Sequence, residues 1–243
     1  MQPLLIALQF LTCLPVRLDG KPEPRAIGVS LLYYPVVGLL MGGMLVVLGM
    51  ALHDTAPALR AALVLAAWIA ITGALHLDGL ADSADAWLGG FGDRERTLAI
   101  MKDPRSGPVA VVMLVVVLLL KFAALWTLLA EGSYLPLVLA PLLGRAALLG
   151  LFLGTPYVRP GGLGQALADH LARTPVSAVL IAVVALCLLL GGRGWLALVV
   201  TCGIGWVARQ AMRRRIGGCT GDTAGALLEL VECGVLVALA LRV

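Results

Sequence analysis

The chain has 243 residues, of which 60% are hydrophobic and 13% are charged, and its mean hydropathy is +0.99. Soluble domains carry about 25% charged residues, so this composition excludes an ordinary soluble protein and indicates an integral membrane protein. The net charge of +4 is dispersed between apolar segments and is no sign of nucleic-acid binding. The five scattered cysteines contain no C-x-x-C pair, so they predict neither a disulfide framework nor a zinc site.

Apolar segments fill most of the chain. Residues 3–14 form a helix that is too short to cross a membrane and lacks the basic flank and cleavage site of a signal peptide. Seven further segments are expected to span the bilayer: residues 29–52, 58–75, 109–130, 135–153, 176–190, 195–207 and 224–241. The second span runs without a break into a polar stretch. The sequence predicts an all-α polytopic membrane bundle of about seven transmembrane helices with polar loops, forming one domain over residues 1–243.

Basic residues are concentrated on one side of this expected topology. Most of the 18 lysines and arginines lie in the N-terminal segment or in the loops at 76–108, 154–175 and 208–223. The positive-inside rule therefore places the N-terminus and these polar loops in the cytoplasm. With seven spans, the C-terminus is expected on the opposite side of the membrane.

Three aspartates carry the strongest chemical signal. Asp78, Asp82 and Asp85 recur at i, i+4 and i+7, which places them within an arc of about 60° on one helix face. Such close like charges repel one another, and charges are costly in a membrane, so a bound cation explains the cluster better than a solvated helix face. Oxygen ligands without cysteine suit Mg²⁺ or Mn²⁺. His76 falls far from this face, where a plain interfacial histidine is the simpler interpretation.

A polar turn precedes the third expected span. It contains Lys102, Asp103, Arg105 and Gly107, and it lies one loop away from the aspartates. Its two cations are suited to hold phosphate oxygens next to a metal site. A positively charged flank of a transmembrane helix would give the same pattern, so both interpretations stay open.

A second acidic group lies at the start of the last span. Asp222, Glu229 and Glu232 are spaced i, i+7 and i+10 after a glycine-rich segment, which places them on one side of a helix. Glutamates in an apolar span do not face lipid. They could extend the metal site, position a substrate, or pair with Arg145, which lies inside the fourth span.

Three motifs carry a resemblance to a known family: HLDGLADSAD from His76, MKDPRSG from Met101 and GGCTGDTAGALLELVE from Gly217. Shorter matches lie at residues 10–15, 34–38 and 159–164. Together they resemble the cobalamin synthases, the adenosylcobinamide-GDP ribazoletransferases of the bacterial membrane, over nearly the whole chain. One departure is Cys13, where the family is expected to carry arginine.

The resemblance implies a reaction. The ribose 3′-hydroxyl of α-ribazole, or of its 5′-phosphate, attacks the cobinamide-linked phosphorus of adenosylcobinamide-GDP, and GMP leaves. In this interpretation Mg²⁺ binds Asp78, Asp82 and Asp85, and Asp82 also accepts the hydroxyl proton. The expected substrate contacts come from Lys102, Asp103, Arg105, Gly107, Gly221, Asp222, Glu229 and Glu232. The implied location is the bacterial inner membrane, and a homo-oligomer is left open.

Two other kinds of protein are compatible with the same composition. One is another Mg²⁺-dependent membrane enzyme with a diphosphate-activated substrate, such as a CDP-alcohol phosphotransferase or a prenyltransferase. The aspartate spacing matches neither. The phosphotransferase signature is D-G-x-x-A-R, but here the alanine comes one place early and Asp82 follows it in place of arginine. The aspartate box of prenyltransferases is also spaced differently. The other is a transporter that uses charges inside the spans, but the two halves of the chain show no internal repeat.

Overall fold

The computed structural model describes residues 2–18 and 20–242, apart from the side chain of Leu163. Residues 1, 19 and 243 of the predicted domain therefore lie outside the described part. Within it, helices account for all regular structure except one parallel β-bridge between Tyr157 and Cys219. The elements are α1 (Gln2–Leu11), α2 (Pro24–Ser30), η1 (Leu31–Tyr33), α3 (Tyr34–Ala51), α4 (Pro57–Thr72), α5 (Leu75–Gly89), α6 (Arg94–Ile100), α7 (Pro108–Ala130), α8 (Leu135–Gly154), α9 (Leu163–Asp169), α10 (Arg173–Leu189), α11 (Gly191–Ile216) and α12 (Gly221–Ala240).

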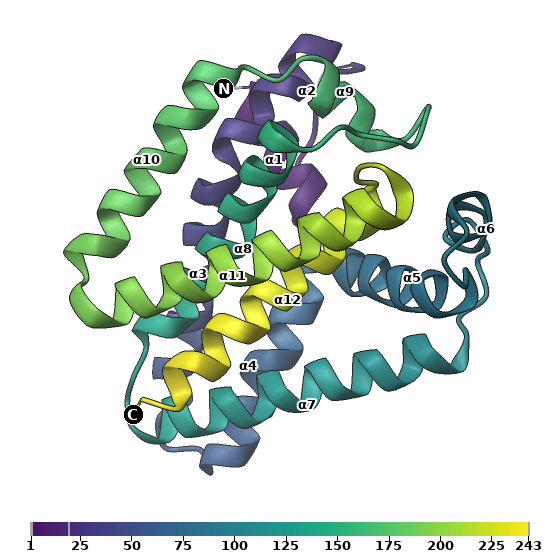
Figure 1. Cartoon of the computed structure of the whole chain (residues 1–243). Helices are drawn as coiled ribbons and strands as arrows, with labels where there is room; N and C mark the ends of the chain where they lie inside the picture. The colour runs from purple at the N-terminus through teal and green to yellow at the C-terminus, as the bar shows by residue number, and fades with distance from the viewer. Residues whose placement is uncertain (1, 19, 243) are drawn as a thin grey trace.

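The predicted all-α membrane bundle is confirmed, and the predicted number of about seven spans is close to the number found. Each of the seven apolar segments forms a helix. In the described residues five helices are long and apolar enough to cross a membrane: the α2–α3 unit Pro24–Ala51, α7, α8, α11 and α12. The pair α4 and α5 gives a sixth span if it is counted as one, while α10 has 17 residues and is shorter than the five spanning helices. The termini lie at opposite ends of the bundle (Figure 1).

The expected continuation of the second span into the aspartate stretch is wrong. Helices α4 and α5 meet at an angle of 87°. Gly73 and Ala74 both adopt left-handed backbone conformations, with φ of 60° and 58°, and these two residues end α4 before α5 begins. Because of this break, α5 leaves the direction of α4 and runs sideways toward α6 (Figure 1). The aspartates therefore lie on a separate helix and not on the end of a transmembrane helix.

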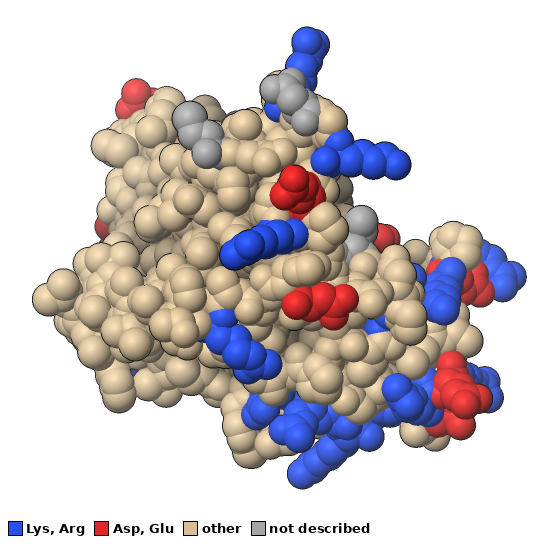
Figure 2. Space-filling view, turned by 90° about the horizontal axis from the view of Figure 1, so that it is seen from above, with Lys and Arg blue, Asp and Glu red and all other residues tan. Residues whose placement is uncertain are grey.

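Helices α8 and α12 form the buried centre of the bundle, and α3 packs directly on α8. A Cβ atom at Gly38 would lie 2.5 Å from the Pro141 carbonyl oxygen, and one at Gly42 would lie 2.7 Å from the Val138 Cα. These two glycines therefore permit the close helix packing that their spacing predicts. The outer helices expose large apolar side chains such as Val112 on α7. In the view of Figure 2, charged side chains are spread over the centre and toward the right and lower edges, while the left part of the surface is largely uncharged, as expected where the surface faces lipid.

Arg60 ties together the helix ends at the side opposite the polar loops. It is 4% exposed, and its Nε donates to the Gly49 carbonyl oxygen at 2.7 Å. Its Nη1 donates to the Leu129 carbonyl oxygen at 3.1 Å, and Nη2 donates to the Tyr134 hydroxyl. One guanidinium therefore satisfies carbonyls in the last turns of α3 and α7, which have no partner within their own helices.

Arg60→Met is expected to lower the free energy of unfolding by about 2–3 kcal/mol, because a charged donor is lost and buried acceptors remain. Thermal unfolding in detergent measures the change. Arg193→Met is the matched control, since this arginine is exposed, and its melting temperature is expected to equal that of the wild type. An unchanged melting temperature for Arg60→Met would contradict the role of Arg60.

Candidate active site

The two acidic groups of the sequence meet where α5 crosses the first turns of α12. Two glycines permit this contact. A Cβ atom at Gly79 would lie 2.8 Å from the Asp222 carbonyl oxygen, and one at Gly225 would lie 3.3 Å from the His76 Cα. A larger side chain at Gly79 would force the backbone to shift, and one at Gly225 would push its neighbour away by a few tenths of an ångström. The crossing brings Asp78, which precedes Gly79, next to the start of α12.

Asp82 lies among carboxylates. Burial of its side chain is the largest cause that raises its pKa, to about 6. The negative charges of Asp78, Asp222 and Asp85 raise this pKa further, while Arg159 lowers it. The junction therefore holds more negative charge than its one neighbouring arginine neutralises, and this is the electrostatic situation that a divalent cation relieves.

Arg159 is a site residue that the sequence analysis did not select. Its Nη1 donates to Asp222 Oδ2 at 2.6 Å. The segment before it pairs with the residue that precedes the α12 cap: the Val158 amide donates to the Cys219 carbonyl oxygen at 2.9 Å, and the Cys219 amide donates to the Pro156 carbonyl oxygen at 2.8 Å. The sequence motif at 159–164 contains Arg159 and could have pointed to it. Its partner Asp222, however, lies 63 residues further along the chain.

The N-terminus of α12 is fixed by a capping box. The Thr220 side chain accepts from the Thr223 amide, and the Thr223 side chain accepts from the Thr220 amide. The Thr220 hydroxyl also lies 3.8 Å from the Met101 sulfur, and Met101 is buried. The start of α12 and the polar turn after α6 are therefore held together, with Gly221 exposed between the cap and Asp222.

Asp85 serves a different purpose from the other two aspartates of α5. Its Oδ2 accepts from the Gly107 amide at 2.5 Å, and its Oδ1 accepts from the Ala110 amide at 2.9 Å. It therefore caps the N-terminus of α7 from a neighbouring helix. A Cβ atom at Gly107 would lie 2.8 Å from Asp85 Oδ1, so glycine is needed there. Both residues were predicted to serve the metal or the substrate, and in this structure they bind each other.

The turn at 102–107 keeps its cations at the surface. Arg105 Nε and Nη2 donate to the two carboxylate oxygens of Asp103 at 2.9 and 2.8 Å. This pairing lowers the pKa of Asp103 to about 2. The Arg105 side chain is 87% exposed, and Lys102 is exposed too. The turn is thus preformed and accessible, which suits contact with a charged ligand that arrives from solvent.

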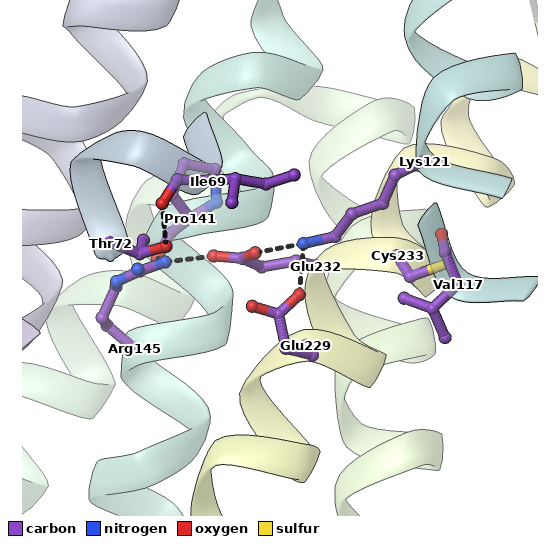
Figure 3. Close-up of polar contacts among 9 residues, drawn as sticks. All are labelled: Ile69, Thr72, Val117, Lys121, Pro141, Arg145, Glu229, Glu232 and Cys233. Carbon is purple, nitrogen blue, oxygen red and sulfur yellow. Dashed lines mark hydrogen bonds and ion pairs between the residues drawn. The ribbon is translucent and has the colours of Figure 1, made fainter. Parts of the chain in front are cut away.

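Glu229 and Glu232 form a buried ion cluster within the bundle (Figure 3). Lys121 Nζ donates to Glu229 Oε2 at 2.5 Å and to Glu232 Oε2 at 2.6 Å. Arg145 Nη1 donates to Glu232 Oε1. The predicted alternative of a pair with Arg145 is therefore found for Glu232, whereas Glu229 pairs with Lys121. Both glutamates are buried and paired with cations inside the bundle. Asp222 instead pairs with Arg159 at the start of α12.

A cavity of about 400 Å³ lies beside the carboxylates and is lined by Asp78, Asp222 and Arg159 at its polar end. A second cavity, of about 600 Å³, adjoins the first, since Tyr157 and Arg159 line both. The loop at 157–160 thus borders both cavities. Asp78 and Asp222 line the smaller cavity, and Arg159 is the site residue that both cavities share.

The donor atoms at the junction suit a hard cation. Asp78, Asp82 and Asp222 offer carboxylate oxygens alone, the ligand type that Mg²⁺ prefers. Burial raises the pKa of Asp82 most, and repulsion from Asp78 and Asp222 raises it further. Asp85 does not fit, because both its oxygens accept backbone amides. Over residues 2–18 and 20–242, no three His, Cys, Asp or Glu side chains are already arranged around one point as ligands.

Gly79→Ala tests the α5–α12 contact. The added methyl group meets the Asp222 backbone, so we expect a loss of about 1–3 kcal/mol in the free energy of unfolding. Displacement of the carboxylates is expected to lower the transfer rate on the order of 10²-fold. Gly43→Ala is the control, since a Cβ atom there meets nothing within 4 Å. Equal rates for the two variants would show that the contact does not position the site.

The apolar helices and the carboxylate site together define an integral membrane enzyme. A family model described as cobalamin-5-phosphate synthase matches residues 3–240, and the chain belongs to this family. The adenosylcobinamide-GDP ribazoletransferase of Stutzerimonas stutzeri strain A1501 is 66% identical over 243 residues, which cover 100% of this chain and 99% of the relative. The protein of the same name from Pseudomonas putida strain F1 is 64% identical over 241 residues, with 99% of each chain covered. No solved structure matches this chain.

Proposed function

We propose that this protein transfers the adenosylcobinamide phosphate group from adenosylcobinamide-GDP to α-ribazole or its 5′-phosphate and releases GMP. The observation that carries this proposal is the meeting of Asp78, Asp82 and Asp222 with Arg159 beside the cavity of about 400 Å³. The names of the relatives supply the substrates. Phosphoryl transfer needs alignment and charge neutralisation more than covalent help from the protein, and this site offers both.

Asp82 acts as the general base in this proposal. The 3′-hydroxyl oxygen of the acceptor bonds to the cobinamide-linked phosphorus, the bond from that phosphorus to GMP breaks, and the hydroxyl proton passes to Asp82. In the metal-free protein a pKa of about 6 leaves this carboxylate mostly ionised at neutral pH, so it is able to accept the proton. Arg159 orients Asp222, and Lys102 and Arg105 bind phosphate oxygens at the surface of the site.

Magnesium is part of the proposal. Asp78, Asp82 and Asp222 would hold it, in place of the predicted set that included Asp85. When bound, the ion would neutralise the charge of the diphosphate and of the three carboxylates. Glu229 and Glu232 lie in their own ion cluster and take no part in this site.

The test is release of GMP from adenosylcobinamide-GDP by the purified protein in nanodiscs. We expect release only when α-ribazole or its phosphate and Mg²⁺ are both present, and we expect a chelator to stop it. Release without an acceptor would point to a hydrolase. No release with any acceptor, from a protein that unfolds cooperatively, would refute the proposed activity.

The same proposal places the site at the cytoplasmic face of the bacterial inner membrane. The basic loops and the positive-inside rule support this orientation, and the termini at opposite ends of the bundle agree with it (Figure 1). We expect an alkaline phosphatase fused after the C-terminus to be active in the periplasm and a green fluorescent protein there to be dark. The reverse pattern would contradict this orientation.

A further inference from the structure

The cavity of about 400 Å³ has two chemically different parts. Its polar end is formed by Asp78, Asp222 and Arg159. Its other walls are apolar and include Leu148 from α8 and Phe152 one turn further along. A ligand that fills it must combine a polar part, placed at the carboxylates, with a mostly apolar part.

Two buried polar side chains that line this cavity have an atom without a hydrogen-bond partner. The Tyr34 hydroxyl and the His76 Nδ1 are both unpartnered, although the residues are 1% and 5% exposed. Ser30 lies near Tyr34, but the two hydroxyls form no hydrogen bond with each other, and the Ser30 hydroxyl donates to the Ile27 carbonyl oxygen at 2.6 Å. Each unpartnered group costs about 1–3 kcal/mol, so two at one cavity call for a ligand that supplies their partners.

The size and polarity of the cavity select among the substrates of the proposed reaction. A corrin ring with its side chains exceeds this volume, whereas a nucleoside fits within it. A guanine base carries several donors and acceptors, and the apolar walls would leave most of them unpaired. The dimethylbenzimidazole base of α-ribazole is apolar on its methylated edge and carries one free ring nitrogen, which matches a wall with few polar groups.

We infer that this cavity is the acceptor subsite, in which the Tyr34 hydroxyl and the His76 Nδ1 recognise the base and ribose of α-ribazole. This inference rests on the proposed function. Tyr34 stacks on Phe10 with ring centroids 6.4 Å apart, which makes an aromatic wall for the base, and its hydroxyl donates to the free ring nitrogen. His76 and Asp78 line the same cavity from α5, so a ribose at the His76 Nδ1 has its 3′-hydroxyl within the cavity that the carboxylates border.

Binding of the nucleoside alone tests this inference without the transfer reaction. Calorimetry is performed with the protein in nanodiscs, without metal and without the corrinoid substrate. Tyr34→Phe keeps the ring and removes the hydroxyl, and we expect it to bind α-ribazole about 5- to 10-fold more weakly than the wild type. Its melting temperature without ligand is expected to be equal or higher, because an unsatisfied buried hydroxyl is removed. Equal affinity of the two proteins would overturn the inference.

A matched ligand sharpens the test. The riboside of 5,6-dimethylindole has a carbon in place of the free ring nitrogen, so the wild type is expected to bind it about 5- to 10-fold more weakly than α-ribazole. Tyr34→Phe is expected to bind the two ligands equally, since the partner of that nitrogen is gone. If Tyr34→Phe still discriminates between them as the wild type does, the hydroxyl does not read the nitrogen and the inference fails.

Ser133→Ala serves as the control variant. The Ser133 hydroxyl is also buried without a partner, but it lies outside this cavity, and its loss is expected to leave α-ribazole binding unchanged. In the transfer assay, Tyr34→Phe should raise the KM for α-ribazole and leave the KM for adenosylcobinamide-GDP unchanged. The wild type could release GMP and yet bind GDP, and not α-ribazole, in this cavity. That result would overturn the subsite and leave the proposed function standing. If α-ribazole binds this cavity but no GMP is released, the subsite would stand and the proposed function would be overturned.

Discussion

Asp82→Asn is expected to abolish transfer while the protein still inserts into the membrane. Asparagine has the size of aspartate but neither accepts the hydroxyl proton nor carries a charge for the cation. General-base catalysis contributes about 10²–10⁴-fold, so the rate of GMP release should fall at least by that factor. Asp54→Asn is the control, because Asp54 is fully exposed in the turn between α3 and α4, and it should keep the wild-type rate.

The same variant has an opposite effect on stability. The pKa of Asp82 is raised from 3.8 to about 6 in the folded protein, so the folded state binds the proton more tightly than the unfolded state. Metal-free wild-type protein therefore loses stability as the pH rises from about 4 to about 6. Asp82→Asn should lack this loss and melt at an equal or higher temperature than the wild type at pH 7. A correctly inserted Asp82→Asn protein with substantial activity would remove Asp82 from the mechanism.

Local patterns in the sequence were enough to predict the helices and the acidic face of α5. The spacing of Asp78 and Asp82 depends on the helix repeat, and the apolar segments depend on composition, so neither needs a distant partner. The break between α4 and α5 was not predictable in this way. The break is in contact with Cys13, which is distant in sequence. The Cys13 amide donates to the Ile71 carbonyl oxygen at 2.7 Å, and its sulfur lies 2.1 Å from the position that a Cβ atom of Gly73 would take.

The roles of individual charges were harder to predict than their positions. Asp85 looked equivalent to its neighbours on the same helix face, and only the N-terminus of α7 against it shows that it is a cap. Arg159 and Asp222 are far apart in sequence and meet because a β-bridge docks one loop on another. Charge and spacing describe a residue, whereas its partner is set by the tertiary fold.

Glu232→Ala is expected to cause the largest loss of stability in the bundle. Glu232 accepts from Lys121 on one side and from Arg145 on the other, and all three side chains are at most 3% exposed. Removal of this carboxylate leaves two buried cations with Glu229 as their one remaining acidic partner in the cluster. Loss of one partner from a buried ion pair costs about 3–5 kcal/mol, which should be visible in thermal unfolding.

The design of this experiment separates a structural role from a substrate contact. Glu131→Gln is the control, because Glu131 is exposed at the end of α7, and it should melt like the wild type. If the cluster is structural, the Glu232→Ala protein that remains folded should keep its turnover number within about 3-fold, well below the loss from a catalytic group. A large loss of turnover at an unchanged melting temperature would instead place Glu232 in the active site, as its spacing from Asp222 first suggested. The short distances to Lys121 and Arg145 favour the structural outcome, since both cations already occupy the oxygens that a substrate would need.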